Sequence, residues 1–164
     1  MVRPPKTPVY GFGKLDRMGL ETAFSIDTSS IKYGPGVTRE VGYELRSRAV
    51  RRVMVLTDPG MSGGDQVLTV LDSISKEGVE AEVFDGVHVE PTDISFKEAI
   101  RFARSGCFDG YVAVGGGSSI DTAKAANLYA THPADFLSYV NAPIGQGNPV
   151  PEPLKPLVAI PTTT

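Results

Sequence analysis

Apolar positions follow two different periods along the chain from about residue 31 onward. Compact apolar or alternating runs predict strands at 52–57, 80–84, 111–114 and 157–160. Between these runs, apolar side chains recur every three or four residues, which predicts helices at 37–45, 67–76, 96–103 and 118–130. Regular alternation of apolar strands with helices predicts an α/β fold, in which helices cover both faces of a parallel sheet.

The first 30 residues show no such period and are rich in Pro, Gly, Ser and Thr, with three prolines in residues 3–8. We therefore predict an extended N-terminal arm over 1–30 and an α/β domain over 31–164. The arm has no apolar core of a secretory signal and little of the character of a transit peptide. This favours the cytoplasm, with the mitochondrial matrix as the alternative.

Charge and residue counts exclude several classes of partner and of binding site. Sixteen Lys and Arg stand against 19 Asp and Glu, giving a net charge of −3 with no basic stripe, so we expect no nucleic-acid partner. Apolar runs are only strand-sized, so no membrane span is expected. Cys107 is the single cysteine and favours a reducing compartment. His88, in an alternating segment, and His132, before a proline, are interpreted as structural, and we expect no self-contained metal site.

Polar or glycine-rich residues follow each predicted strand. They are Asp58, the turn 90–92, the glycines 115–117 and the threonines 162–164. Ligands of parallel α/β sheets bind beyond the carboxyl ends of the strands, so these residues are expected to share one functional edge.

Gly115, Gly116 and Gly117 join a predicted strand to a predicted helix. Glycines let the backbone approach a ligand closely, and a helix N-terminus favours anions, so the run is suited to hold a diphosphate. The spacing matches neither G-x-G-x-x-G nor the P-loop motif. A plain tight turn remains the alternative interpretation.

Four nearby side chains also have structural interpretations. Ser118 is a candidate N-cap with Asp121 at the third helical position, as in a capping box, and Asp121 alternatively contacts a ligand. Lys124 is interpreted as a solvated helix residue. Asp58 either accepts hydrogen bonds from the ribose hydroxyls of an adenosine or forms a turn before Pro59.

Several longer segments, in order, resemble the iron-containing (group III) alcohol dehydrogenase family, and most closely its hydroxyacid-oxoacid transhydrogenase branch. The likeness covers about residues 20–164. The segments that carry it are IKYGPGVTREVG (31–42), TD (57–58), VEPTD (89–93), FDGYVAVGGGS (108–118) continuing to 129, NAPIG (141–145) and PLVAIPTTT (156–164).

The resemblance implies a Rossmann-like, dehydroquinate-synthase-like N-terminal domain that binds NAD. It assigns the diphosphate to a loop made of Gly116, Gly117, Ser118, Ser119 and Asp121. It assigns the adenine ribose to Asp58, with preference for NAD over NADP, and the nicotinamide side to Thr162 and Thr163. Glu90, where many members of the family have asparagine, is a further expected cofactor contact.

The resemblance also implies a metal-dependent oxidoreductase that couples 4-hydroxybutyrate oxidation to 2-oxoglutarate reduction. Its divalent metal, Fe or Zn, is held by an aspartate and three histidines of a helical second domain. None of those positions falls within residues 1–164, so we expect an N-terminal lobe with no catalytic residue and no activity alone. A homo-oligomer is compatible with this expectation.

Two other interpretations stay open at this point. One is a stand-alone nucleotide-binding or regulatory module. The other is a relative of polyol or glycerol dehydrogenases, against which the segments 31–42 and 141–145 argue. The Pro- and Gly-rich stretch 141–153 is interpreted as a surface loop rather than part of a cleft wall.

Overall fold

The computed structural model describes residues 29–162, and the unit that begins at Lys32 is considered by itself. The predicted arm, 1–30, lies almost entirely outside the described residues, as does Thr163. The boundary between arm and domain therefore stays a prediction.

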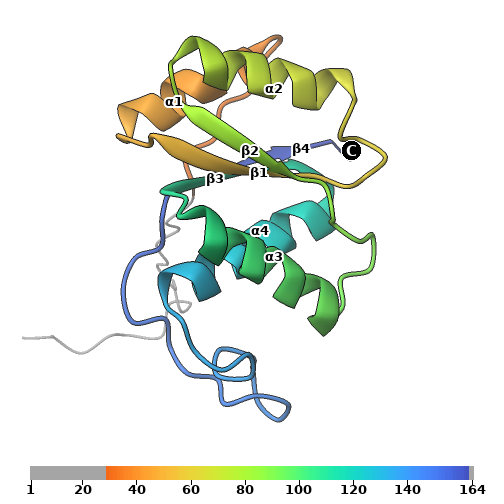
Figure 1. The fold of residues 1–164 in the computed structure, drawn as a ribbon, viewed down its shortest axis with the longest axis vertical. Helices are drawn as coiled ribbons and strands as arrows, with labels where there is room; N and C mark the ends of the chain where they lie inside the picture. Colours follow the sequence, from red (N-terminus) through yellow and green to blue (C-terminus); the bar gives the residue numbers. More distant parts are fainter. Residues whose placement is uncertain (1–28, 163–164) are drawn as a thin grey trace, which may run out of the picture. The chain divides into compact units, whose positions relative to one another are not determined.

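Four parallel strands form one sheet in the order β2-β1-β3-β4 (Figure 1). Their bounds are Arg52–Leu56 for β1, Glu80–Phe84 for β2, Gly110–Gly115 for β3 and Leu157–Pro161 for β4. The predicted α/β fold with an all-parallel sheet is confirmed.

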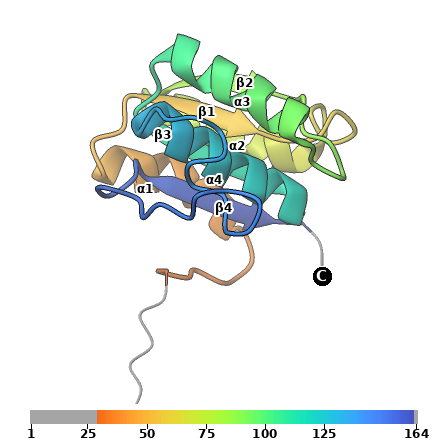
Figure 2. The ribbon, with the colours of Figure 1, turned by 90° about the horizontal axis from the view of Figure 1, so that it is seen from below.

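Helices cover both faces of this sheet, with α1 and α2 on one side and α3 and α4 on the other (Figures 1 and 2). A short 3₁₀ helix, Val37–Glu40, leads into them, and the helices are α1 (Val41–Ser47), α2 (Asp65–Lys76), α3 (Asp93–Gly106) and α4 (Gly117–Thr131). Successive strand residues point to opposite faces, so Val53 and Val55 pack toward α1 and α2, while Met54 and Leu56 pack toward α3 and α4.

Two local differences from the sequence-based elements have clear causes. The helix predicted from residue 96 begins at Asp93, because Thr92 and Ser95 form a capping box that extends it by one turn. The alternation around His88 does not continue β2. Instead, residues 85–88 form a loop in which Val87 is buried and His88 is exposed.

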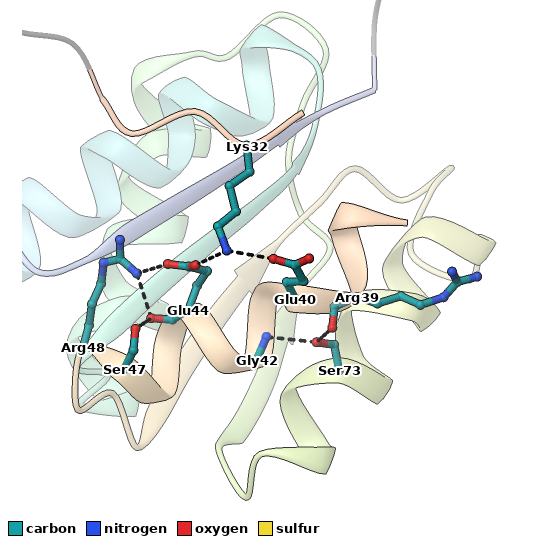
Figure 3. A network of polar contacts seen from close by, with 8 residues as sticks. All are labelled: Lys32, Arg39, Glu40, Gly42, Glu44, Ser47, Arg48 and Ser73. Atoms are coloured by element: carbon teal, nitrogen blue, oxygen red, sulfur yellow. Dashed lines mark hydrogen bonds and ion pairs between the residues drawn. The ribbon is translucent and has the colours of Figure 1, made fainter. Parts of the chain in front are cut away.

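The contact between α1 and α2 is unusually close at Gly42 (Figure 3). A Cβ atom at Gly42 would lie 2.1 Å from the carbonyl oxygen of Ser73. The buried Ser73 hydroxyl accepts a hydrogen bond from the Gly42 N–H at 2.9 Å and donates one to the Arg39 carbonyl at 2.7 Å. One hydroxyl thus satisfies backbone groups at the start of α1, where a helix lacks internal partners.

Beside this contact, Lys32 is tied to the first turns of the helical region (Figure 3). Its ammonium lies 2.7 Å from Glu40 and 2.5 Å from Glu44, and Glu44 also pairs with Arg48. Hydrogen bonds from Lys32 and then Arg48 lower the pKa of Glu44, and those to Glu40 and Glu44 raise the pKa of Lys32. Because Lys32, Glu40 and Arg48 are exposed and only Glu44 is half-buried, the network fixes position more than it adds stability.

Replacing Ser73 tests the α1–α2 contact. We expect Ser73→Ala to lower the free energy of unfolding by about 1–3 kcal/mol, because it leaves the buried Gly42 N–H without its hydrogen-bond partner. The matched control is Ser47→Ala, since the exposed Ser47 hydroxyl donates to the Glu44 carbonyl within its own helix and links no two elements of the described chain. Urea denaturation of both variants measures the difference, and equal losses would contradict the role of Ser73.

Candidate nucleotide-binding site

The strand order creates a divergence at the carboxyl edge of the sheet. The connection from β1 to β2 runs through α2 on one face, and the connection from β3 to β4 runs through α4 on the other. After the adjacent strands β1 and β3, the chain therefore crosses to opposite faces of the sheet and continues to opposite sides of this strand pair. Such a switch point is where open α/β sheets bind ligands.

At this point the chain turns from β3 into α4 through glycines. Gly115 has φ +148°, and a Cβ atom there would lie 2.3 Å from the buried Ser119 hydroxyl, so only glycine fits. Gly116 is the N-cap of α4 and supplies no side-chain cap. A Cβ atom at Gly117 would meet no atom within 4 Å. No contact within the described residues requires the glycine at 117, and its missing side chain leaves the helix start open to a ligand.

The capping-box interpretation of Ser118 and Asp121 is wrong. The helix begins at Gly117, so Gly116 takes the N-cap position and Ser118 is already the second helical residue. The Ser118 hydroxyl instead donates to the carbonyl of Val89. Asp121 is exposed and lies 3.4 Å from Lys124, which is also exposed, as its interpretation as a solvated residue predicts.

Asp58 lies two residues after the end of β1, and its carboxylate faces this turn. Its carboxylate lies 3.8 Å from the position of a Cβ on Gly115, and it accepts no hydrogen bond within residues 29–162. Its backbone carbonyl accepts from the Met61 N–H at 3.0 Å, so the residue does form a turn. The main chain of Asp58 therefore forms a turn, as one interpretation predicts, while its carboxylate stays available to a ligand.

Thr162 joins the site from the end of β4. Its N–H donates to the Gly115 carbonyl at 3.1 Å, and its hydroxyl lies 3.5 Å from the sulfur of Met61. Met61 was not identified from the sequence, because a methionine in a loop carries no pattern that places it beside a distant strand.

Two further features at this edge were missed. Thr57 carries a buried hydroxyl for which the described residues offer no hydrogen-bond partner. Its place at the end of a strand could have drawn attention to it. The Val89 carbonyl that Ser118 engages had no signal in the sequence, since a main-chain acceptor is independent of residue type.

Glu90 lies on the loop that returns from β2 to α3, and it is exposed. The bond from Ser118 to Val89 fastens this loop to the first turn of α4. The structure thus brings together the rim residues that sequence reasoning proposed and that it describes, namely Asp58, Glu90, Gly116, Gly117, Ser118, Ser119 and Thr162. Asp121 lies on the exposed side of the same helix.

The stretch 141–153 leads back to the amino end of the sheet, which is the end opposite to the glycine turn. It leads into β4 through Lys155, whose ammonium donates to the Phe108 carbonyl, and Pro156, whose carbonyl accepts from the Tyr111 N–H. Tyr111 stands near the amino end of β3, whereas Gly115 ends it. The interpretation as a surface loop, visible below α4 in Figure 1, is confirmed.

Two hollows on the surface lie away from the glycine turn. One, of about 370 Å³, is lined by α3, α4 and residues 134 and 136. The other, of about 210 Å³, lies between the 3₁₀ helix and the start of α2. Among residues 29–162, no three His, Cys, Asp or Glu side chains gather so as to hold a metal ion. None of the helices in that range combines the length and apolarity that crossing a bilayer needs.

Comparison with known proteins decides the family. The family model for iron-containing alcohol dehydrogenase matches residues 28–164. The chain belongs to the iron-containing alcohol dehydrogenase family. Both the expected family and its oxidoreductase character are confirmed.

Similar proteins within this family support the transhydrogenase branch. The Bos taurus hydroxyacid-oxoacid transhydrogenase, mitochondrial, is 57% identical over 143 residues, which are 87% of this chain and 31% of that protein. The Xenopus laevis protein of the same name is 54% identical over 162 residues, 98% of this chain and 35% of that protein. The chain thus spans about a third of the length of these relatives.

Solved structures of the family share the fold. A 1,3-propanediol oxidoreductase is 30% identical, with a TM-score of 0.72, over 79% of this chain and 33% of that chain. The NADH-dependent butanol dehydrogenase A of Thermotoga maritima, 24% identical, matches 88% of this chain and 35% of that chain with a TM-score of 0.75, which shows the fold alone. The expected Rossmann-like N-terminal domain is confirmed.

Substitution of two glycines separates the constrained from the open part of the turn. We expect Gly115→Ala to lower the free energy of unfolding by about 2–3 kcal/mol, because it combines a positive φ with a clash against Ser119. Gly117→Ala, the matched control in open space, is expected to change stability by less than about 1 kcal/mol. Thermal or urea unfolding measures both, and a larger loss at Gly117 would contradict this geometry.

Proposed function

We propose that the described domain is the NAD-binding lobe of a hydroxyacid-oxoacid transhydrogenase-type oxidoreductase. The observation that carries the proposal is the open N-terminus of α4, which follows the glycine turn and faces the Asp58 carboxylate across the β1–β3 switch point. This arrangement offers an anion seat and a hydroxyl acceptor side by side, which is the pair of groups that an adenosine diphosphate needs.

The fit to NAD can be followed from group to group. The first two N–H groups of α4, at Gly117 and Ser118, point out of the helix toward its start, where the helix carries about half a positive charge, whereas the Ser119 N–H donates to the Gly116 carbonyl at 3.1 Å. They are suited to hold the diphosphate. Asp58 is suited to accept from both ribose hydroxyls of the adenosine, and its charge repels a 2′-phosphate.

Strand order gives the dinucleotide a direction. Asp58 and the loop with Glu90 follow β1 and β2, whereas Thr162 follows β4 on the other side of the glycine turn. The adenosine therefore lies toward Glu90, and the nicotinamide lies toward Thr162 and Thr163. Asp121, exposed on the first turns of α4 beside Lys124, stays a proposed cofactor contact.

Bound NAD supplies a hydride acceptor, and the lobe orients it. In the proposed reaction, 4-hydroxybutyrate is oxidised and 2-oxoglutarate is reduced by the same cofactor. The family's divalent metal finds no ligand set among residues 29–162, so no step through a metal is assigned to this lobe. The relatives are named as mitochondrial proteins, which supports the mitochondrial alternative over a cytoplasmic location. A homo-oligomer stays a prediction.

Cofactor titration tests the proposal directly. We expect the chain to bind NAD⁺ at least about tenfold more tightly than NADP⁺, because hydrogen bonds to the charged Asp58 contribute about 1.5–3 kcal/mol. Asp58→Gly is expected to lose most of this discrimination. The control is Asp85→Gly, which removes an exposed loop carboxylate after the neighbouring strand. Equal affinities in the unmodified chain, or unchanged preference in Asp58→Gly, would contradict the assignment.

Catalysis by this chain alone is a separate test. We expect no NADH formation from 4-hydroxybutyrate and NAD⁺ when Fe(II) or Zn(II) is added, because the described residues provide no cluster of three His, Cys, Asp or Glu side chains to hold the metal. Absorbance at the NADH band measures the rate, with a chelator-treated sample as the control. A metal-dependent rate from homogeneous protein would show that this chain holds a complete catalytic site.

A further inference from the structure

The Ser118 hydroxyl forms a hydrogen bond with another segment of the protein and is not free at the proposed anion seat. It donates to the main-chain carbonyl of Val89, 29 residues earlier, on the loop between β2 and α3. A hydroxyl has one proton to donate. While it is given to Val89, Ser118 can offer a ligand its backbone N–H but not its side-chain proton.

The loop that receives this bond is firmly held on both sides. Val87 is buried in the core and donates its N–H to the Thr57 carbonyl, and Thr92 forms the capping box of α3. Within the described residues, the four positions between them, 88–91, have one hydrogen bond to the rest of the protein, which is the bond from Ser118. The position of the exposed Glu90 therefore depends on Ser118.

We propose that Ser118 is a positioning residue, whose hydroxyl fixes the 88–91 loop through Val89 and so holds Glu90 at the adenosine end of the dinucleotide. The proposal rests on the proposed function, because Glu90 lies at the adenosine end only if NAD lies across the glycine turn. It differs from a role for the hydroxyl as a direct donor to the diphosphate. In that case Ser118 would act on phosphates alone and independently of Glu90.

The loop contact is tested without ligand by NMR of the 1–164 chain. Loss of the hydrogen bond in Ser118→Ala is expected to shift the carbonyl ¹³C resonance of Val89, and Ser118→Thr, which keeps a hydroxyl, is expected to restore it. Ser105→Ala is the control, because that hydroxyl also donates to a backbone carbonyl but lies at the far end of α3. An unchanged Val89 resonance in Ser118→Ala overturns the proposal.

A double-mutant cycle then tests whether the loop acts on the cofactor. NAD⁺ affinity is measured for the unmodified chain, Ser118→Ala, Glu90→Ala and the double variant. We expect each single change to lower the affinity for NAD⁺ about three- to tenfold, which is the effect of one hydrogen bond. The double variant is expected to bind NAD⁺ no less tightly than the single variant with the lower affinity. Binding of inorganic pyrophosphate is expected to be the same with and without the Ser118 hydroxyl.

The outcomes separate this proposal from the proposed function. Independent, multiplying effects of the two changes, or weaker pyrophosphate binding in Ser118→Ala, overturn the positioning role while leaving NAD binding intact. Absence of NAD⁺ binding in the unmodified chain overturns the proposed function, and the positioning role falls with it. Coupled effects together with a shifted Val89 resonance support both.

Discussion

The geometry of the candidate site depends on one very short connection, in which the chain passes from β3 into α4 at Gly115. The strand ends and the helix begins within two residues, and the backbone reaches φ +148° directly above the buried Ser119 side chain. A side chain at 115 would force these atoms apart. Because the turn is this tight, the helix starts at the edge of the sheet, with its first N–H groups directed away from the core.

The other parts of the site are arranged around this turn. The Gly115 carbonyl receives the Thr162 N–H, which fixes the end of β4, and Asp58 lies against the same residue from β1. The two-sided core allows this arrangement, since α2 and α4 pack on opposite faces and leave the edge between β1 and β3 uncovered. The strand order thus accounts both for the helices packed on the two faces of the sheet and for the open edge between β1 and β3.

The sequence predicts those features that periodicity or topology determines. Buried strands and helical faces repeat at fixed spacing, and parallel strands bring their carboxyl ends to one edge, so the place of Asp58 and Gly116 was predictable. The role of Ser118 was not. Whether a helix begins at 117 or 118 depends on the tight glycine turn, and the partner of Ser118 lies on a loop with no periodic pattern.

Main-chain groups and side chains have different roles at the proposed site, which is consistent with a fold that is kept while sequences diverge. The proposed anion seat consists of main-chain N–H groups and glycines, and a structure only 30% identical keeps the same architecture, with a TM-score of 0.72. Selectivity must then come from the few side chains that reach the seat. In the proposed site these are Asp58, two residues after β1, and Glu90, on a loop that a single hydroxyl holds in place, so the proposal expects a change at either position to alter ligand preference without altering the fold.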